Sequence, residues 1–448
     1  AMSSLLNNSI VVNKLQITTE QLQVLVAAQI SNNAGNTEGT KQALTTGSTA
    51  LNAVECNFAP ACELLNRTPC VMKEHTCGSC QSGYVGDSGP SNALCVSESL
   101  RRAAPVAVNG TLPCSSASDC GLWQTCTAGT CVALQKTCAA QCSGHGHCGF
   151  LDTNTDLQLM TCDEGNQACE AHCVCDATYA GATCSVTVST LAGRQAARGA
   201  LIDSLIVMVN QEDATADSII NWVTSLAMIV QNSDEIGASY LVKLVSLTEL
   251  ILEAAATVKL SLEGTNSLFQ VVGTISEMRS TTSTGRRLLG SDSVTPSFVR
   301  TRRLAADDLQ RISSSIDGMS GMLLDDMVVG QNTIDLIDDT FRISTIATDL
   351  APGQTRAFTT ASTALEDISR AATPYISVPS NKTGPAVLKM ALVVKKGKLY
   401  DLDTLQNGQV ANVQAGVQWN SSLISNSLKL SVDCSDQEVA DQLVYFTI

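Results

Sequence analysis

Cysteines are concentrated in one part of this chain, and their density limits what that part can fold into. Eighteen of the nineteen lie between Cys56 and Cys184, about one in every seven residues. This density is typical of small domains in which disulfides replace a hydrophobic core, and disulfides persist in oxidising compartments. We therefore expect a chain that passes through the secretory pathway and works outside the cell or at its surface.

Glycosylation sequons favour the same location. An Asn-x-Ser/Thr sequence is an acceptor for N-linked glycans in secreted proteins. The chain has five such asparagines: Asn7, Asn66, Asn109, Asn381 and Asn420. We expect N-linked glycans on them.

Composition excludes several classes of partner. The chain has 448 residues and a formal net charge of −15, which disfavours nucleic acid and anionic membranes. The best candidate for a membrane span, residues 241–262, carries four charged side chains, so we expect a soluble helix there and no span in this chain. The start of the chain lacks the basic flank and apolar run of a signal peptide, which predicts a mature product or a piece of a longer protein.

Cysteine spacing changes along the dense region and divides it into modules at 56–95, 96–135 and 136–185. The first has six cysteines, whose fifteen possible pairings stay open. The second is a compact four-cysteine knot, for which our hypothesis is an alternate pairing: Cys114–Cys126 and Cys120–Cys131. Residues 1–55 are polar, and we interpret them as an N-terminal segment that closes off a missing domain. Within them we expect a short helix at 20–30 and then a loop at 32–39.

The third module has the clearest pattern. Its cysteines follow C-x3-C-x5-C and then C-x-C-x8-C, with Ser-Gly-His-Gly at 143–146 and Tyr-Ala-Gly at 179–181. It resembles the EGF-like repeats of tenascins and teneurins, and residues 76–86 of the first module are similar to EGF- and TNF-receptor-like repeats. The resemblance of the third module implies three disulfides: Cys138–Cys148, Cys142–Cys173 and Cys175–Cys184. Cys162 and Cys169 exceed the pattern, and we expect them to bridge each other. No acidic pair precedes the first cysteine, so we expect no calcium.

After Cys184 the apolar residues take helical spacing. Five segments each show one apolar stripe, which predicts helices that pack on one another: 194–209, 217–231, 236–262, 267–278 and 304–329. A Ser/Thr/Gly-rich stretch at 280–303 interrupts them, and we interpret it as an exposed loop.

Alternating apolar residues replace the helical spacing from residue 343 onward. Strands are predicted at 387–394, 427–432 and 443–448, with turn residues between them. The fold class is therefore multidomain: small disulfide-rich modules, then an α-helical bundle over 186–332 and an antiparallel β-sandwich over 333–448.

A helical region before a sandwich, with Val-Gly-Gln at 329–331 leading to Phe-Arg-Ile-Ser at 341–344, resembles the GAIN/REJ region of polycystin-like and adhesion receptors. The resemblance covers about 186–448. That family ends in a segment with paired cysteines, tryptophans and a His-Leu-Ser/Thr self-cleavage triplet. This chain lacks the segment, since Trp419 and Cys434 stand alone. The resemblance thus implies the fold, and we do not claim self-cleavage within this chain.

Ionisable side chains do not form a catalytic pattern. All four histidines lie in the cysteine modules, which leaves the helical and strand regions without a histidine for a Ser-His-Asp relay or a zinc site. Cys77, Cys80 and His75 have the form of a zinc knuckle, but we favour disulfides beside so many cysteines. The aspartates at 325–326 and 335–339 are interpreted as solvated helix ends and turns. We predict no enzyme activity, no metal site and no cofactor.

Two further features concern processing and partners. Arg300, Arg302 and Arg303 form the Arg-x-Arg-Arg sequence that furin-like proteases cut, and an accessible loop would expose it. Basic residues are also common in uncut loops, so both interpretations stay open. Cys434 is the odd thiol, which pairs beyond this chain, pairs with another chain or stays buried; a partner outside this chain is the more informative hypothesis.

These features predict a non-catalytic extracellular adhesion or structural protein. We expect a disulfide-stiffened building block of a cell-surface or flagellar hair (mastigoneme-like) assembly, in which EGF-type modules form a stalk. Its partners would be other extracellular proteins or copies of itself. The alternative is the ectodomain of a polycystin-like or adhesion-type receptor that senses contact or force. A third class, an extracellular hydrolase, lacks a set of catalytic groups.

Overall fold

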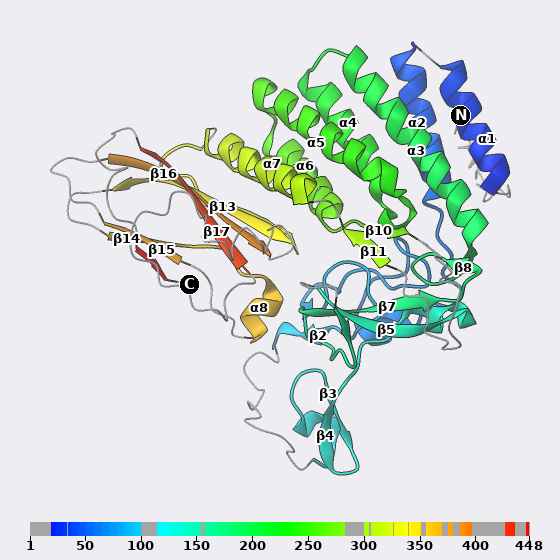
Figure 1. Cartoon of the computed structure of the whole chain (residues 1–448). Coiled ribbons are helices and arrows are strands. Elements are labelled where there is room, and N and C mark those ends of the chain that lie inside the picture. The colour runs from blue at the N-terminus through cyan, green and yellow to red at the C-terminus, as the bar shows by residue number, and fades with distance from the viewer. Residues whose placement is uncertain are drawn as a thin grey trace, which may run out of the picture.

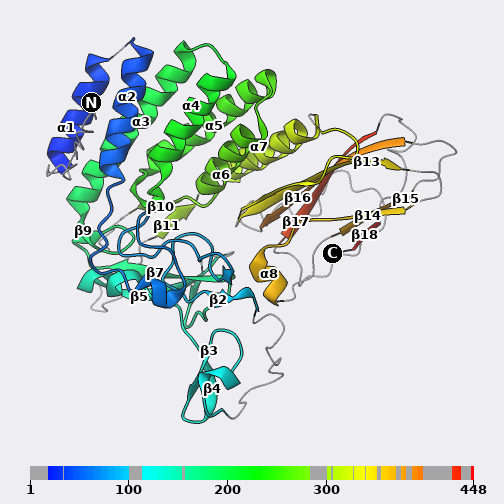
Figure 2. The ribbon, with the colours of Figure 1, turned by 180° about the vertical axis from the view of Figure 1, so that it is seen from behind.

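The computed structural model of the chain describes residues 19–33, 35–99, 114–153, 157–282, 300–303, 306–325, 327–338, 340–350, 355–369, 375–379, 386–396, 426–434 and 445–447. These residues contain eight α-helices and several small antiparallel sheets. Seven helices lie side by side, with a sheet beyond the last of them (Figure 1). The cysteine modules lie at one end of the helices, and the view from behind shows the same arrangement (Figure 2).

The helices form an array of two layers. Their bounds are α1 Thr19–Asn32, α2 Thr37–Leu51, α3 Val188–Gln211, α4 Ala216–Val230, α5 Ala238–Val258, α6 Leu262–Ser276 and α7 Ala306–Asp325. Helices α1, α3, α5 and α7 contact one another in sequence along one layer, and α2, α4 and α6 form the other. Their apolar stripes meet in one core that includes Trp222, Ile251 and Phe269. The predicted helices after Cys184 are confirmed as α3 to α7.

Residues 19–51 belong to this helical array, which corrects the interpretation of residues 1–55 as the end of a missing domain. Val26 of α1 and Leu44 of α2 lie in the same core as Leu201 of α3. The sequence does not predict α2, because its many Thr and Gly residues have low helix propensity and dilute its apolar stripe. The helix begins inside the loop expected at 32–39, because the Asn36 side chain caps it and the core buries Leu44.

The cysteine modules are therefore an insertion between two helices of one array. The chain leaves the array after α2 and re-enters it at α3, whose first turn is capped by the Thr187 hydroxyl. One buried side chain joins the two points: Arg198 of α3 donates to the Asn52 side-chain oxygen at 2.9 Å and to the Ile229 carbonyl at 2.7 Å. Its guanidinium is fully buried and is paired with the Glu235 carboxylate at 2.8 Å.

A four-stranded antiparallel sheet follows the helices. Its order is β12 (Ile334–Ile337), β13 (Phe341–Leu350), β16 (Ala386–Lys396) and β17 (Asn426–Cys434). A separate three-stranded sheet has the order β14 (Thr355–Thr359), β15 (Tyr375–Pro379) and β18 (Tyr445–Thr447), and α8 (Ala364–Ser369) lies between β14 and β15 in sequence. The predicted strands are present as β16, β17 and β18.

The larger sheet packs on α6 and α7 and shares their core. Phe341 of β13 meets Phe269 of α6 edge to face at 4.6 Å between ring centres, and Val393 of β16 joins the same cluster. Lys395 is 1% exposed and pairs with Asp317 of α7 at 2.8 Å. The boundary expected at residue 332 thus separates two kinds of secondary structure that share one core.

The segment around the Arg-x-Arg-Arg sequence differs from the predicted exposed loop. Residues Arg279–Thr282 (β10) and Arg300–Arg303 (β11) form a two-stranded antiparallel ladder between α6 and α7. Cross-strand hydrogen bonding was not expected there, because Ser, Thr and Gly dominate the segment. Residues 283–299 lie outside the described part of the chain.

Small sheets occur in the cysteine modules: β1 (Tyr84–Val85) with β2 (Val96–Ser97), β3 (Gln124–Thr127) with β4 (Thr130–Ala133), β5 (Gly146–Asp152) between β6 (Gln158–Leu159) and β7 (Cys169–Cys175), and β8 (Tyr179–Ala180) with β9 (Val186–Thr187). The β3–β4 hairpin projects away from the rest of the molecule (Figure 1).

Among the described residues, no helix combines the length and the apolar character needed to cross a bilayer.

Replacing Arg198 with alanine should destabilise the whole array. The change removes one of the two arginines of α3 that pair with the buried Glu235 carboxylate, the other being Arg194, and it also breaks the bonds to Asn52 and to the Ile229 carbonyl. Loss of one partner from a buried pair typically costs about 3–5 kcal/mol. Urea unfolding should show this loss, whereas Lys243→Ala, which removes an exposed pair with Asp203, should leave the midpoint almost unchanged. Equal effects of the two substitutions would contradict the role of Arg198.

Candidate functional site at the junction of the cysteine modules

Nine disulfides hold the three modules. The first module is bonded Cys56–Cys70, Cys62–Cys77 and Cys80–Cys95. The second contains Cys114–Cys126 and Cys120–Cys131, and the third contains Cys138–Cys148, Cys142–Cys173, Cys162–Cys169 and Cys175–Cys184. The structure thus joins every pair named from the sequence in the second and third modules.

The first module, whose pairing the sequence leaves open, has the same order of bonds as the EGF-like cysteines of the third. In both, the first cysteine bonds to the third, the second to the fourth and the fifth to the sixth. A Gly-Tyr-Val-Gly stretch before the last cysteine of the first module parallels Tyr-Ala-Gly in the third, and this signal points to a common connectivity. Cys77 and Cys80 carry disulfides, so their sulfurs are not thiolate ligands for zinc.

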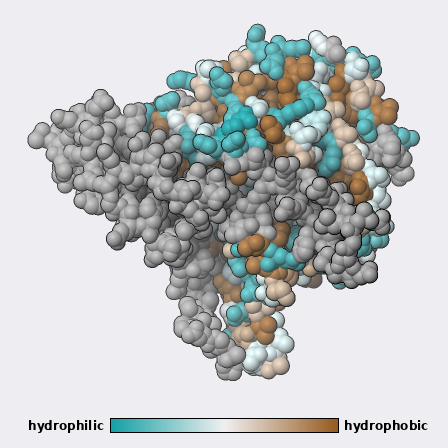
Figure 3. Space-filling view, viewed as in Figure 1, coloured by the Kyte–Doolittle hydropathy of each residue, from teal (hydrophilic) through white to brown (hydrophobic). Residues whose placement is uncertain are grey.

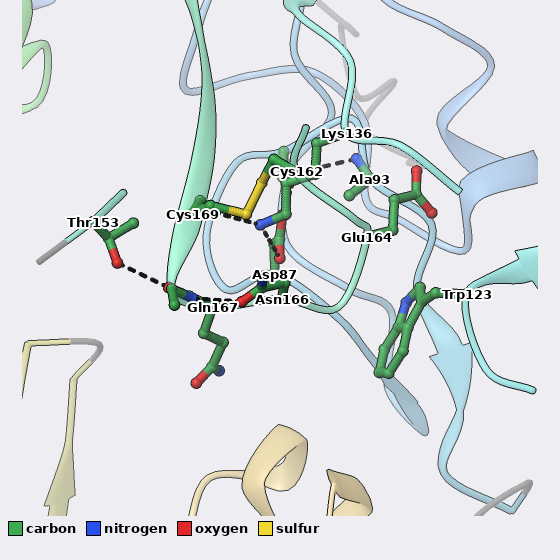
Figure 4. A network of polar contacts seen from close by, with 12 residues as sticks. Asp87, Ala93, Trp123, Lys136, Thr153, Cys162, Glu164, Asn166, Gln167 and Cys169 are labelled. Atoms are coloured by element: carbon green, nitrogen blue, oxygen red, sulfur yellow. Dashed lines mark hydrogen bonds and ion pairs between the residues drawn. A yellow bond between two sulfur atoms is a disulfide. The ribbon is translucent and has the colours of Figure 1, made fainter. Parts of the chain in front are cut away.

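All three modules meet at one residue, Leu94. Its amide N–H donates to the Glu164 carboxylate of the third module at 3.4 Å, and its carbonyl accepts from the Trp123 indole N–H of the second at 3.1 Å. The Trp123 carbonyl also accepts from Leu134 N–H, and the Leu134 carbonyl accepts from Glu164 N–H. Figure 4 shows Trp123, Glu164 and the residues beside them. The junction therefore fixes the second module against the other two.

Gly165 lets the Trp123 ring approach the third module. A Cβ atom at this position would lie 2.4 Å from the indole, and the residue has a φ of +78°. Any other side chain would collide with the ring and would strain the backbone. The sequence does not reveal this contact, because the two residues are far apart and belong to different modules.

Lys136 joins the first and third modules beside the junction. Its ammonium donates to the Asp87 carboxylate at 3.0 Å and to the Cys169 carbonyl at 3.0 Å (Figure 4). The side chain is 8% exposed, so this pair is shielded from water. Such a shielded, hydrogen-bonded pair fixes orientation better than an exposed pair does.

Burial raises the pKa of Glu164, and the nearby Asp87 carboxylate raises it further. The Leu94 N–H and the cations Lys136 and Arg67 oppose these effects. The carboxyl therefore holds its proton more readily in the folded protein than in the unfolded chain.

Arg67 fills the centre of the first module. Its guanidinium is fully buried and donates four hydrogen bonds of 2.6–3.1 Å to the backbone carbonyls of Gly78, Asp87, Gly89 and Ala93. One cation thus organises a loop that has few apolar side chains. Nothing in the local sequence distinguishes this arginine from an exposed one.

A polar cleft of about 280 Å³ lies next to the junction, between the first module, the third module and the helix–sheet region. Asp87 and Lys136 line one part of it, and Glu277 and Thr340 close it from the α6 and β13 side. The lysine and the aspartate already pair with each other.

Figure 3 shows several separate hydrophobic areas over the helices on the visible face, and no single broad one.

The remaining ionisable candidates have structural contacts. The His145 ring stacks on Tyr179 at 3.6 Å between ring centres, and His75 is buried with its ring edge-on to Phe58. The Asp338 carboxylate accepts from the Thr340 amide and hydroxyl, which forms the turn between β12 and β13. Potential metal-ligand groups in the described residues consist of cysteines that are already disulfide-bonded.

Most of the other sites predicted from the sequence lie at the ends of described segments or outside the described residues. Asn7, Asn109, Asn381 and Asn420 lie outside the described residues. Cys434 ends β17, opposite Leu388 in the register, and the hypothesis of a partner outside this chain stays a prediction. Arg300, Arg302 and Arg303 lie in β11, so a protease must separate this strand from β10 before it can bind the backbone.

Asn66 is placed unfavourably for the predicted glycan. It caps a short 3-10 helix with a φ of 54°, and its side-chain amide donates to the Cys95 carbonyl at 2.8 Å. The nitrogen that would carry the sugar is therefore partly buried and already bonded. Of the five sequons, this is the one whose surroundings the structure describes, and they disfavour a glycan there.

No protein-family model matches this chain, and no curated protein matches it.

Replacing Glu164 with glutamine should flatten one part of the dependence of stability on pH. Because the folded pKa of this carboxyl is raised above the ordinary 4.5, its stabilising effect is complete below that value and is lost as pH rises through the folded pKa. The free energy of unfolding of the wild type should therefore fall over this window relative to the variant. Thermal melts across pH 4–8 test this, with exposed Glu63→Gln as the control. A wild-type slope in the Glu164 variant would contradict the prediction.

Asn66 should carry no glycan in the secreted protein. Enzymatic release of N-glycans in heavy-oxygen water, followed by peptide mass spectrometry, marks each occupied asparagine. The peptide with Asn66 should stay unlabelled because its amide is bonded to Cys95. Full occupancy of Asn66 would show that this part of the first module folds differently.

Proposed function

We propose that this chain is a non-catalytic structural unit of an extracellular assembly on a cell surface or flagellum. The observation that carries the proposal is the junction at Leu94, where hydrogen bonds from two modules converge on one residue of a third. Such a junction, with nine disulfides around it, supports a rigid unit that keeps its shape under external stress. The oxidised cysteines and the sequons favour a route through the secretory pathway.

The proposed shape differs from a simple stalk. The first and third modules lie against the end of the helical array, where Glu74 accepts from Ser185 at 2.6 Å and lies 3.6 Å from Arg194. The second module alone projects (Figure 2). We propose that the array and the two sheets form a bundle and a sandwich of the GAIN-like kind, and that the projecting module contacts other extracellular proteins.

The order of a helical region and then antiparallel sheets also supports the alternative of a polycystin-like or adhesion-receptor ectodomain. The two proposals differ in where the chain is found. A structural unit should be released with the surface or hair fraction when cells are sheared. A receptor ectodomain should stay with the membranes as part of a longer polypeptide.

Shearing followed by quantitative mass spectrometry of both fractions should find this chain mainly in the sheared material, with its cysteines as cystines. The receptor would be established instead if peptides of this chain were concentrated in the membrane fraction and came from the same gel band as peptides of a membrane-spanning segment. Free thiols throughout residues 56–184 in material alkylated at lysis would overturn both proposals.

A further inference from the structure

Cys148 differs from the other cysteines of the modules in its exposure. All eighteen are described and disulfide-bonded, and Cys148 is the one that is exposed, while the others are buried or half-buried. Its partner is Cys138. A disulfide exchanges when a thiolate attacks one of its sulfurs, and the rate depends on access to that sulfur. Cys148 is therefore the half-cystine that an external thiol reaches most easily.

The Cys138–Cys148 disulfide closes a strained turn. Four consecutive residues of this turn, 140–143, carry a Cβ atom and have φ angles of 48–55°. Left-handed backbone is costly for such residues, which adopt it singly and not in runs. A strained segment persists only where the surrounding structure holds it. Here the Cys138–Cys148 bond holds the two ends of the turn, and the Cys142–Cys173 bond holds its middle.

A buried hydroxyl adds to the cost of this turn. The Ser143 side-chain oxygen is buried, and within the described residues it has no hydrogen-bond partner. An unsatisfied buried hydroxyl is unfavourable, because its bonds to water are lost and not replaced. The observed disulfides thus hold the turn in a conformation that its own residues oppose.

A second disulfide lies beside the first. The sulfurs of Cys138, Cys142 and Cys173 all lie within 4.8 Å of one another, so a thiolate at Cys138 would lie next to the Cys142–Cys173 bond. Cys148 lies directly opposite Cys173 in the β5–β7 register. Directly opposite residues of an antiparallel pair have Cα atoms about 4.5–5.5 Å apart and side chains on one face, which suits a disulfide. The same four cysteines can therefore pair in a second way, as Cys138–Cys142 and Cys148–Cys173.

We propose that Cys148 is a site of thiol–disulfide exchange, at which an external thiol switches the third module between these two pairings. The external thiolate attacks the Cys148 sulfur, forms a mixed disulfide there and releases Cys138 as a thiolate. This thiolate attacks the Cys142 sulfur, which forms the Cys138–Cys142 bond and releases Cys173. The Cys173 thiolate then attacks Cys148, forms the cross-strand disulfide and releases the external thiolate. No net oxidation or reduction occurs, and the external thiol is regenerated.

The switch lies in one wall of the polar cleft. Cys138, Ala139 and Cys173 line this cleft. Lys136 precedes Cys138 closely in the sequence and pairs with Asp87 of the first module. Because re-pairing releases the turn, it should loosen this wall and the contact between the two modules. The inference goes beyond the proposed function and does not depend on it.

Brief treatment of the whole native protein with reduced glutathione tests the first step. Acid quenching and peptide mass spectrometry locate the glutathione adducts. Cys148 should be modified at least about tenfold faster than any other half-cystine, because it is the accessible one. Preferential modification of another cysteine would overturn the inference. The same assay with a protein disulfide isomerase identifies the source of the thiol: a faster reaction than with glutathione assigns it to a protein, and a slower one to a small molecule.

Longer treatment tests the switch itself. The second pairing should appear, with each cystine located by electron-transfer fragmentation of the peptides. Amide hydrogen exchange over residues 136–144 should become faster in the re-paired protein, because the turn is released. Recovery of the native pairing alone, or unchanged exchange in re-paired protein, would refute the switch.

Glycine substitutions in the turn test the role of strain. Ala140→Gly and Gln141→Gly remove Cβ atoms that oppose a positive φ, so they should favour the native pairing. In the double variant, the equilibrium ratio of the second pairing to the native pairing should fall at least about tenfold. The control is Ala139→Gly, a position whose φ is not positive, and it should not lower the ratio. An unchanged ratio in the double variant would contradict the role of strain.

Paired serine substitutions locate the reactive disulfide. Cys138→Ser with Cys148→Ser should abolish the fast reaction with glutathione. The control, Cys162→Ser with Cys169→Ser, removes a buried disulfide of the same module and should still react at Cys148. An equally fast reaction without Cys138 and Cys148 would overturn the inference. Circular dichroism confirms folding, and the glycine variants keep every cystine, so they test the inference even if loss of a disulfide unfolds the module.

Discussion

The buried pair between Arg198 and Glu235 is the interaction on which the arrangement of this molecule depends. The guanidinium of Arg198, on α3, donates to Asn52 directly after α2 and to the Ile229 carbonyl near the end of α4. It also donates to the Glu235 carboxylate. A charge without water is tolerated only when its hydrogen bonds are satisfied. The site therefore forms only when the segment before the cysteine modules and the segment after them come together.

This closure explains how disulfide-rich modules and a conventional hydrophobic core coexist in one chain. The helices and the larger sheet share a core that reaches from Leu22 to Val393. The modules rely on cystines, on the buried Arg67 and on polar contacts at Leu94, because they contain few apolar residues to bury. The contact of Glu74 with Arg194 of α3 attaches the modules to the helical array. The molecule thus combines two different ways of stabilising a fold.

The sequence predicts the parts of the structure that rest on local patterns. Helical stripes of apolar residues identify α3 to α7, the EGF-like resemblance implies three pairs of the third module, and the alternate pairing in the second module was a hypothesis. The sequence does not predict α2, whose stability comes from packing of Leu44, nor the ladder at Arg279 and Arg303, which depends on how α6 and α7 are placed. The junction of Trp123, Leu94 and Glu164 could not be predicted either, because its bonds join residues that no spacing rule connects. At Asn66 a sequence motif is present, but a tertiary hydrogen bond occupies its nitrogen.

The insertion of the modules between α2 and α3 has a mechanical consequence. Tension applied along the helical array enters and leaves through helices and strands, while the cysteine modules form a side branch whose two ends are held together at Arg198 and Asn52. The cystines therefore bear no load until α2 separates from α3. Under moderate pulling, the helix contacts would yield first, and the closed side branch would then extend only as far as its covalent loops allow.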